Sequence, residues 1–147
     1  MKKIMLLILF LTVLTSCKKD DSNPVTADNE MVGTWVLTNI SGTTTSQGAI
    51  SIPPSQAGIS MTIVFNSNKT CTITTVQQEQ TTNETDNWST SNGKITFTPV
   101  NGGGTAMVLP YTRTGNKVNV DFSSLISIIA TNSSVTFTQL MFEFTKQ

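Results

Sequence analysis

The chain has 147 residues, a length that supports one compact domain and leaves little room for a second. Its nine basic and nine acidic side chains balance, which argues against a nucleic-acid partner, because such binding depends on Lys and Arg neutralising phosphates. The sequence contains no histidine, which excludes Ser-His-Asp and Cys-His catalysis and histidine-ligated metals.

The first sixteen residues have the form of a bacterial signal peptide. Lys2 and Lys3 precede an apolar run over residues 4–14, which is shorter than the ~20 apolar residues that span a bilayer. The run ends in Leu14-Thr15-Ser16-Cys17, which resembles the lipobox cleaved by lipoprotein signal peptidase. The resemblance implies that residues 1–16 are removed and that Cys17 becomes a lipidated N-terminus, carrying a thioether-linked diacylglycerol. The alternative for Cys17 is a disulfide with Cys71, which is otherwise expected to be a small buried side chain.

Residues 17–30 are predicted to be the lipidated cysteine followed by a flexible, polar tether. Within it, Lys19-Asp20-Asp21 resembles the export signal of surface lipoproteins of Bacteroidota. This resemblance implies the cell-surface side of the outer membrane, with the periplasmic leaflet as the alternative. Removing Lys2 and Lys3 with the signal peptide leaves seven basic and nine acidic side chains. Attachment is therefore expected to depend on acyl chains, because no polybasic patch assists it.

From residue 31 onward, apolar residues recur with a period of two, which predicts β-strands. Thr, Ser and Asn make up 53 of the 147 residues, and these types favour strands and the turns that join them. Short connections of hairpin type follow several of the alternating runs. The predicted strands cover residues 33–41, 60–66, 70–78, 84–90, 94–99, 106–113, 116–122 and 134–145.

Four stretches depart from simple alternation. Residues 42–58 are predicted to be a long loop or lid, and residues 123–130 a short helix or turn covering one end of a sheet, with a strand as the alternative. In the last strand, Phe137 and Leu140 lie in opposite phases, which predicts a β-bulge near Gln139. The polar run 77–83, flanked by Glu79, Glu84 and Asp86, is interpreted as a solvated hairpin end without an acid–base pair.

Eight antiparallel strands in this length predict an all-β fold, an up-and-down barrel with a β-sandwich as the alternative. Closing the sheet into a barrel removes the exposed strand edges on which chains aggregate. The interior of an eight-stranded barrel is wide enough either to be filled by side chains or to hold one small ligand.

Three features follow the lipobox, namely Gly33-Thr34-Trp35, the hairpin from Phe65 to Thr70, and a second hairpin containing Trp88. Together they are similar to the features of the lipocalin-like lipoproteins of Bacteroidota. The resemblance covers residues 31–147 and implies a calycin-type barrel with a floor made by Gly33, Trp35 and Arg113. In this reading the guanidinium of Arg113 stacks on the Trp35 ring, whereas the alternative is that Arg113 is a solvated strand residue.

The predicted function is a lipid-anchored, non-enzymatic binding module of the cell envelope that captures a small apolar ligand or docks a protein partner. The alternative is a structural or accessory subunit of a surface complex, with a filled barrel and no ligand. No catalytic residue, metal site or cofactor is predicted. The side chains expected to line a ligand, unless they simply fill the core, are Met61, Ile63, Phe65, Trp88, Phe97, Met107, Leu109, Val120 and Phe142.

Overall fold

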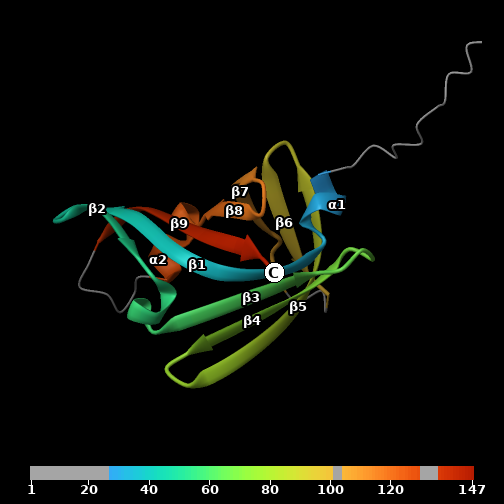
Figure 1. Cartoon of the computed structure of the whole chain (residues 1–147), viewed down its shortest axis with the longest axis horizontal. Coiled ribbons are helices and arrows are strands. Elements are labelled where there is room, and N and C mark those ends of the chain that lie inside the picture. The colour runs from blue at the N-terminus through green and yellow to red at the C-terminus, as the bar shows by residue number, and fades with distance from the viewer. Residues whose placement is uncertain (1–26, 101–103, 130–135) are drawn as a thin grey trace, which may run out of the picture.

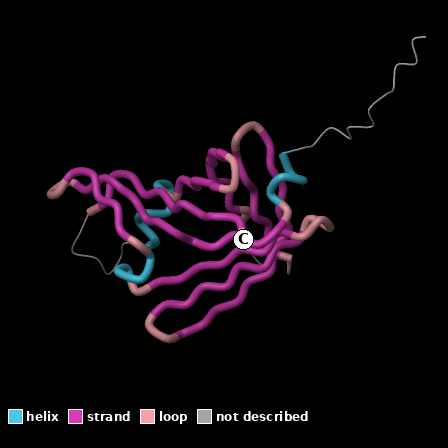
Figure 2. Tube along the Cα trace, in the orientation of Figure 1, coloured by secondary structure: helices cyan, strands magenta, loops and turns pink. Residues whose placement is uncertain are grey.

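The computed structural model describes residues 27–100, 104–129 and 136–147, and strands account for most of this part of the chain (Figures 1 and 2). Cys17, the predicted signal peptide and residues 17–26 of the predicted tether lie outside the described residues. In chain order the elements are α1 (Ala27–Met31), β1 (Gly33–Thr44), β2 (Gly48–Ile52), the 3₁₀ helix η1 (Pro54–Ala57), β3 (Ile59–Phe65), β4 (Thr70–Gln77), β5 (Gln80–Ser91), β6 (Lys94–Pro99), β7 (Met107–Thr114), β8 (Lys117–Asp121), the 3₁₀ helix η2 (Ser123–Leu125), α2 (Ile126–Ile129) and β9 (Phe137–Lys146).

Eight of the strands form a closed antiparallel barrel. Their order around it is β1-β3-β4-β5-β6-β7-β8-β9, and β9 pairs with β1 to complete the circle. The remaining strand, β2, pairs with the second half of β1, beyond the part of β1 that pairs with β3. The predicted all-β barrel is confirmed, and the alternative β-sandwich is not the fold.

The alternating apolar residues face the inside of the barrel and form its core. The core residues are Met31, Trp35, Leu37, Ile40, Ile63, Phe65, Cys71, Trp88, Ile95, Phe97, Leu109, Val118, Val120, Phe122, Leu140, Phe142 and Phe144. Short turns between the strands use backbone conformations with positive φ, as at Asn92 (51°) and Gly93 (69°) between β5 and β6. These are the φ values of a type I′ turn, whose twist matches that of the strands it joins.

Two β-bulges keep β1 and β9 facing the core along their whole length. In β1 the register passes from Leu37↔Phe144 to Asn39↔Glu143, which leaves Thr38 as the extra residue. The bulge therefore allows both Leu37 and Ile40 to be buried although they are three positions apart. A second register shift lies between Thr43 and Thr44, opposite residues 137–139 of β9, as the phase change near Gln139 predicts.

Two sequence-based boundaries need correction. The predicted loop over residues 42–58 is instead the end of β1, the strand β2 and the helix η1. β2 was not predicted because its side chains are exposed or only half-buried, so that backbone pairing with β1 holds it and no apolar alternation marks it. Helix α1 starts at Ala27, so residues 27–30, the last part of the predicted tether, are helical.

The segment after β8 forms the short helices η2 and α2, which agrees with the predicted helix or turn and not with the alternative strand. η2 and α2 pack against β9, and Leu125 and Ile126 contact the core from one side. Within the described residues, no helix is both long enough and apolar enough to cross a membrane. The barrel thus has one end covered by α1 and an opposite end where the β4–β5 turn lies (Figure 1).

Candidate functional site: the two ends of the barrel

We call the end covered by α1 the closed end, and aromatic side chains fill it. Trp35 is 1% exposed, and the Phe65 ring meets the Trp88 ring edge-on with the centroids 4.9 Å apart. Phe97 also stacks against Phe65, with the ring centroids 6.1 Å apart. Buried aromatic pairs in these geometries stabilise a fold beyond the area that they bury. This half of the interior is therefore a packed core.

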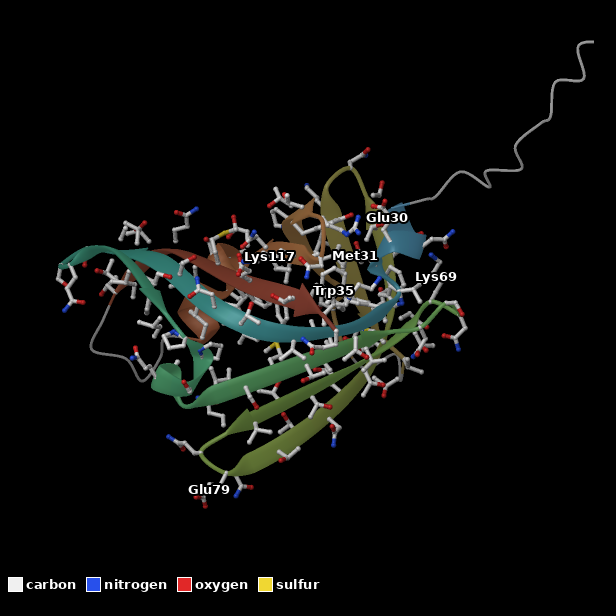
Figure 3. All side chains as sticks on the ribbon, viewed as in Figure 1. Glu30, Met31, Trp35, Lys69, Glu79 and Lys117 are labelled. Carbon is white, nitrogen blue, oxygen red and sulfur yellow. The ribbon has the colours of Figure 1, made fainter. Side chains whose placement is uncertain are left out.

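Helix α1 seals the closed end through its last residue. Met31 is buried, and its backbone oxygen accepts a hydrogen bond from the indole nitrogen of Trp35 at 2.6 Å. This bond satisfies the one polar atom of a tryptophan that is otherwise surrounded by apolar groups. Figure 3 shows Glu30, Met31, Trp35 and Lys69 gathered at this end, and Glu79 at the far end of the molecule.

Two acidic residues of α1 bind cations, one in the turn between β3 and β4 and one on β7. The Asp28 carboxylate lies 2.6 Å from the ammonium of Lys69 and also accepts hydrogen bonds from the backbone N–H and the hydroxyl of Thr90. Glu30 forms an ion pair with Arg113 on β7. Burial alone would raise the pKa of Asp28, but the hydrogen bonds from Lys69 and Thr90 together hold this pKa below its usual value.

The cation above the Trp35 ring is Lys146, whose Nζ lies 5.5 Å from the ring centroid. The stack of Arg113 on Trp35 that the family resemblance implies is not found, because Arg113 pairs with Glu30 and Lys146 lies over the ring. The alternative for Arg113, a solvated strand residue, does not describe it either, since its side chain is only 26% exposed. Gly33 makes the Lys146 position available: it has a φ of 132°, and a Cβ there would lie 2.7 Å from Lys146 Cε.

Replacing Asp28 by asparagine is expected to lower the free energy of unfolding near neutral pH by about 1–2 kcal/mol, because the charge-assisted bonds to Lys69 and Thr90 are lost. The folded-state pKa of Asp28 is lowered, so its contribution is present above the unfolded-state pKa and disappears as the pH falls through the folded-state pKa. Urea denaturation of both proteins across this acid range should therefore show their stabilities converging. An equal difference at neutral and strongly acid pH would contradict this assignment, and Glu79→Gln, which changes an exposed carboxylate, is the control.

On β3, β4 and β5, burial decreases toward the opposite end, which we call the open end, whereas β1 stays buried on its inner face up to Thr44. Along the inner face of β3, Phe65 and Ile63 are buried, whereas Met61 and Ile59 are half-buried. On β4 the inner face passes from buried Cys71 through half-buried Ile73 and Thr75 to exposed Gln77. On β5 it passes from buried Trp88 and Asp86 to exposed Glu84, Thr82 and Gln80. Solvent therefore reaches the inner faces of these three strands from the open end.

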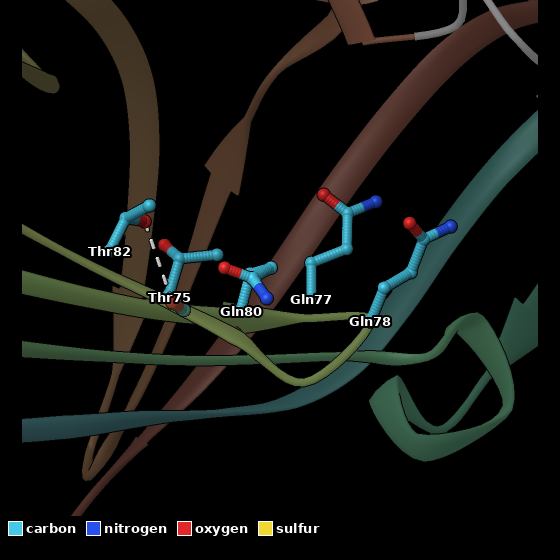
Figure 4. Close-up of a pocket in the computed structure, with 5 residues that line it drawn as sticks. All are labelled: Thr75, Gln77, Gln78, Gln80 and Thr82. Atoms are coloured by element: carbon cyan, nitrogen blue, oxygen red, sulfur yellow. Dashed lines mark hydrogen bonds between the residues drawn. The ribbon is translucent and has the colours of Figure 1, made fainter.

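The rim of the open end carries a polar pocket on the β4–β5 hairpin. Its volume is about 270 Å³, and it is lined by Thr75, Gln77, Gln78, Gln80 and Thr82. Figure 4 shows these five side chains extending from the same side of the hairpin ribbon. The Thr82 hydroxyl donates to the Thr75 carbonyl at 3.4 Å, whereas the amide groups are available to a ligand. Hydroxyl and amide groups both donate and accept, so this rim suits uncharged polar groups.

The structure places all nine predicted ligand-lining residues in or against the core. Seven of them are buried, namely Ile63, Phe65, Trp88, Phe97, Leu109, Val120 and Phe142, and they fill the barrel. The other two, Met61 and Met107, are half-buried. Of the predicted set, these two methionines are the side chains that combine an inward position with partial exposure. Cys17 lies outside the described residues, and Cys71 is a free, fully buried cysteine.

Asp86 is the residue that sequence reasoning misplaced. It was assigned to a solvated hairpin end, but it is 4% exposed and lies on the inner face of β5. Its position relative to Trp88 could have predicted this burial, because residues two positions apart share one face of a strand. Burial raises the pKa of Asp86, and burial together with the nearby Asp86 charge raises the pKa of the Cys71 thiol to about 12.

No protein-family model matches the chain, and no curated protein matches it in sequence. The fold is therefore established by the strand pairing described above, which closes eight antiparallel strands into a barrel and adds one further strand.

Proposed function

We propose that the chain is a non-enzymatic, lipid-anchored binding module of a bacterial cell envelope, which takes up a small ligand at the open end of its barrel. The observation that carries this proposal is the gradient of burial along β3, β4 and β5. A protein without a ligand is expected to fill its barrel from end to end. Along β3, β4 and β5 the filling stops partway, and partly exposed apolar side chains at Ile59, Met61 and Ile73 face the inside.

The anchoring part of the proposal rests on the sequence before α1. The lipobox ending at Cys17 supports a diacylglycerol anchor, and Lys19-Asp20-Asp21 supports the cell-surface side of the outer membrane. The barrel is compatible with the lipocalin-like lipoproteins that the sequence resembles. The ion pairs of α1 also bear on this proposal, because they fix the residues that follow the tether to the closed end. The chain therefore enters the barrel at the end opposite the ligand.

A structural or accessory role is the second candidate, and the packed closed half favours it. Four buried aromatic side chains fill this half of the interior, namely Trp35, Phe65, Trp88 and Phe97. In this role the open end would dock a protein partner of the envelope in place of a small molecule. The two candidates differ in whether the protein isolated from its own host carries a small ligand.

Native mass spectrometry of the full chain purified from its host is expected to detect an added small-molecule mass. Thr75→Trp places a large ring on the inner face and is expected to reduce the occupied fraction strongly, because it fills the open end. Thr74→Trp is the matched control, since the neighbouring threonine faces outward, where its hydroxyl donates to Asn83. Absence of any added mass in the wild type, or equal occupancy in the two variants, would refute capture at the open end.

A further inference from the structure

A buried carboxylate oxygen in the barrel has no partner among the described residues. Asp86 Oδ1 is shielded from solvent, and no described donor lies within hydrogen-bond distance of it. Its two neighbours in register are Cys71 on β4 and Pro99 on β6. A proline has no N–H group and a thiol is a weak donor, so neither neighbour can satisfy a carboxylate. Buried polar groups are almost always paired, which points to a donor outside the described residues.

Asp86 lies at the boundary between the packed core and the open end. The preceding inward residue, Glu84, is exposed, whereas the following one, Trp88, is buried. A molecule that enters along the inner face of β5 therefore passes Glu84 and reaches Asp86 last. Successive inward residues of a strand are about 6.6 Å apart. Asp86 is thus the first buried polar group on this face, directly beyond the part of β5 that solvent reaches.

The inner face along this path carries negative charge and no described positive charge. The inward positions of β3 are Ile59, Met61, Ile63 and Phe65, those of β4 are Cys71, Ile73, Thr75 and Gln77, and those of β5 from the tip to the core are Gln80, Thr82, Glu84, Asp86 and Trp88. These positions include two carboxylates and neither a lysine nor an arginine. Uncompensated carboxylates in a partly desolvated site favour a cation.

The same face also has an apolar side. Each row of paired residues begins with an apolar residue on β3 and ends with a polar residue on β5, as in Ile63–Ile73–Glu84 and Met61–Thr75–Thr82. An amphipathic molecule fits such a face, because its apolar body lies against β3 while its polar groups lie against β5.

We propose that the ligand class is an amphipathic organic amine, whose protonated amino group binds Asp86 and whose apolar body lies along Ile73, Met61 and Ile59. This inference rests on the proposed function, since it specifies the ligand of the same open end. Hydrogen bonds from an ammonium to a buried carboxylate are about twice as strong as neutral ones. They would also remove the burial penalty that raises the pKa of Asp86.

Three probes that share one chain length and differ in their head group test the charge preference. They are n-hexylamine, n-hexanol and hexanoate, titrated calorimetrically near neutral pH into the full chain carrying Cys17→Ser, so that no acyl chain of the protein competes for the site. The amine is expected to bind at least about tenfold more tightly than the alcohol, and the carboxylate more weakly still. Equal affinity for the amine and the alcohol, or tighter binding of the carboxylate, would overturn the proposal.

Substitutions locate the site. Asp86→Asn keeps the shape of the side chain and removes its charge, and it is expected to weaken amine binding at least about tenfold. Glu79→Gln removes the same charge at the exposed hairpin tip, which points away from the barrel (Figure 3), and should change the affinity less than about twofold. Unchanged amine affinity in Asp86→Asn would overturn the assignment. If Asp86→Asn does not fold, as judged by circular dichroism, the three-probe titration of the protein that retains Asp86 tests the proposal alone.

The failure of this inference is distinguishable from the failure of the proposed function. If the native protein carries an added mass but shows no preference for the amine, ligand capture stands and the amine class is wrong. If the native protein carries no added mass and none of the three probes binds, both proposals fail.

Discussion

Trp35→Ala is expected to lower the free energy of unfolding by about 3–5 kcal/mol, the usual cost of removing a fully buried aromatic side chain. Trp35 is 1% exposed, donates to the backbone of Met31 and lies beneath the Lys146 ammonium. Its loss therefore creates a cavity, leaves the Met31 carbonyl without its donor and loosens α1. Chemical denaturation followed by circular dichroism measures the change.

Two comparisons make the Trp35 result specific. Val108→Ala is the control, since Val108 is 49% exposed and its truncation should cost less than about 0.5 kcal/mol. Trp35→Phe retains most of the ring volume but cannot donate to Met31, so its cost should lie between those of Trp35→Ala and the wild type. If Trp35→Ala lowers the free energy of unfolding by less than about 1 kcal/mol, instead of the expected ~3–5 kcal/mol, the closed end is not the stabilising core of the barrel.

Cys17→Ser is expected to abolish incorporation of a palmitate analogue and to release the protein from membranes. Only a thiol can form the thioether bond to diacylglycerol, and the predicted mature chain has no polybasic patch to retain it electrostatically. Metabolic labelling followed by membrane fractionation measures both effects. External protease added to intact cells should also remove the wild-type barrel if it faces outward.

The second cysteine provides the internal control for labelling. Cys71 is fully buried and its thiol pKa is about 12, so it is neither accessible nor ionised near neutral pH. Cys71→Ser should therefore leave the labelling unchanged. Equal labelling of Cys17→Ser and the wild type would disprove acylation at Cys17. Resistance of intact cells to protease, with cleavage after lysis, would assign the barrel to the periplasmic leaflet.

The strands of the barrel were predictable because each buries one face, so that apolar residues recur at every second position of the sequence. The bulge near Gln139 followed from the same rule, since Phe137 and Leu140 cannot share a face of a regular strand. β2 escaped prediction because it contributes backbone hydrogen bonds to β1 and few buried side chains. Short α1 escaped for a similar reason, because five residues are too few to show a helical period.

The contacts of the closed end depend on residues far apart in the chain. Lys146 reaches Trp35 because β9 pairs with β1, and Arg113 reaches Glu30 because α1 folds over the end of β7. Local sequence patterns do not specify whether Arg113 or Lys146 lies over the Trp35 ring. The position of Asp86 depends similarly on its register with Cys71 and Pro99. A polar residue in a polar stretch gives no sign of burial until its strand neighbours are known.

The pairing of the first barrel strand with the last has a consequence for how the protein reaches its native state. Thr38 bonds to Thr145 across 107 positions of sequence, so the ring of strands cannot close before β9 has been synthesised. Topologies dominated by such distant contacts fold slowly. The nascent polypeptide therefore keeps unpaired strand edges on β1 and β8 until β9 is available to pair with both.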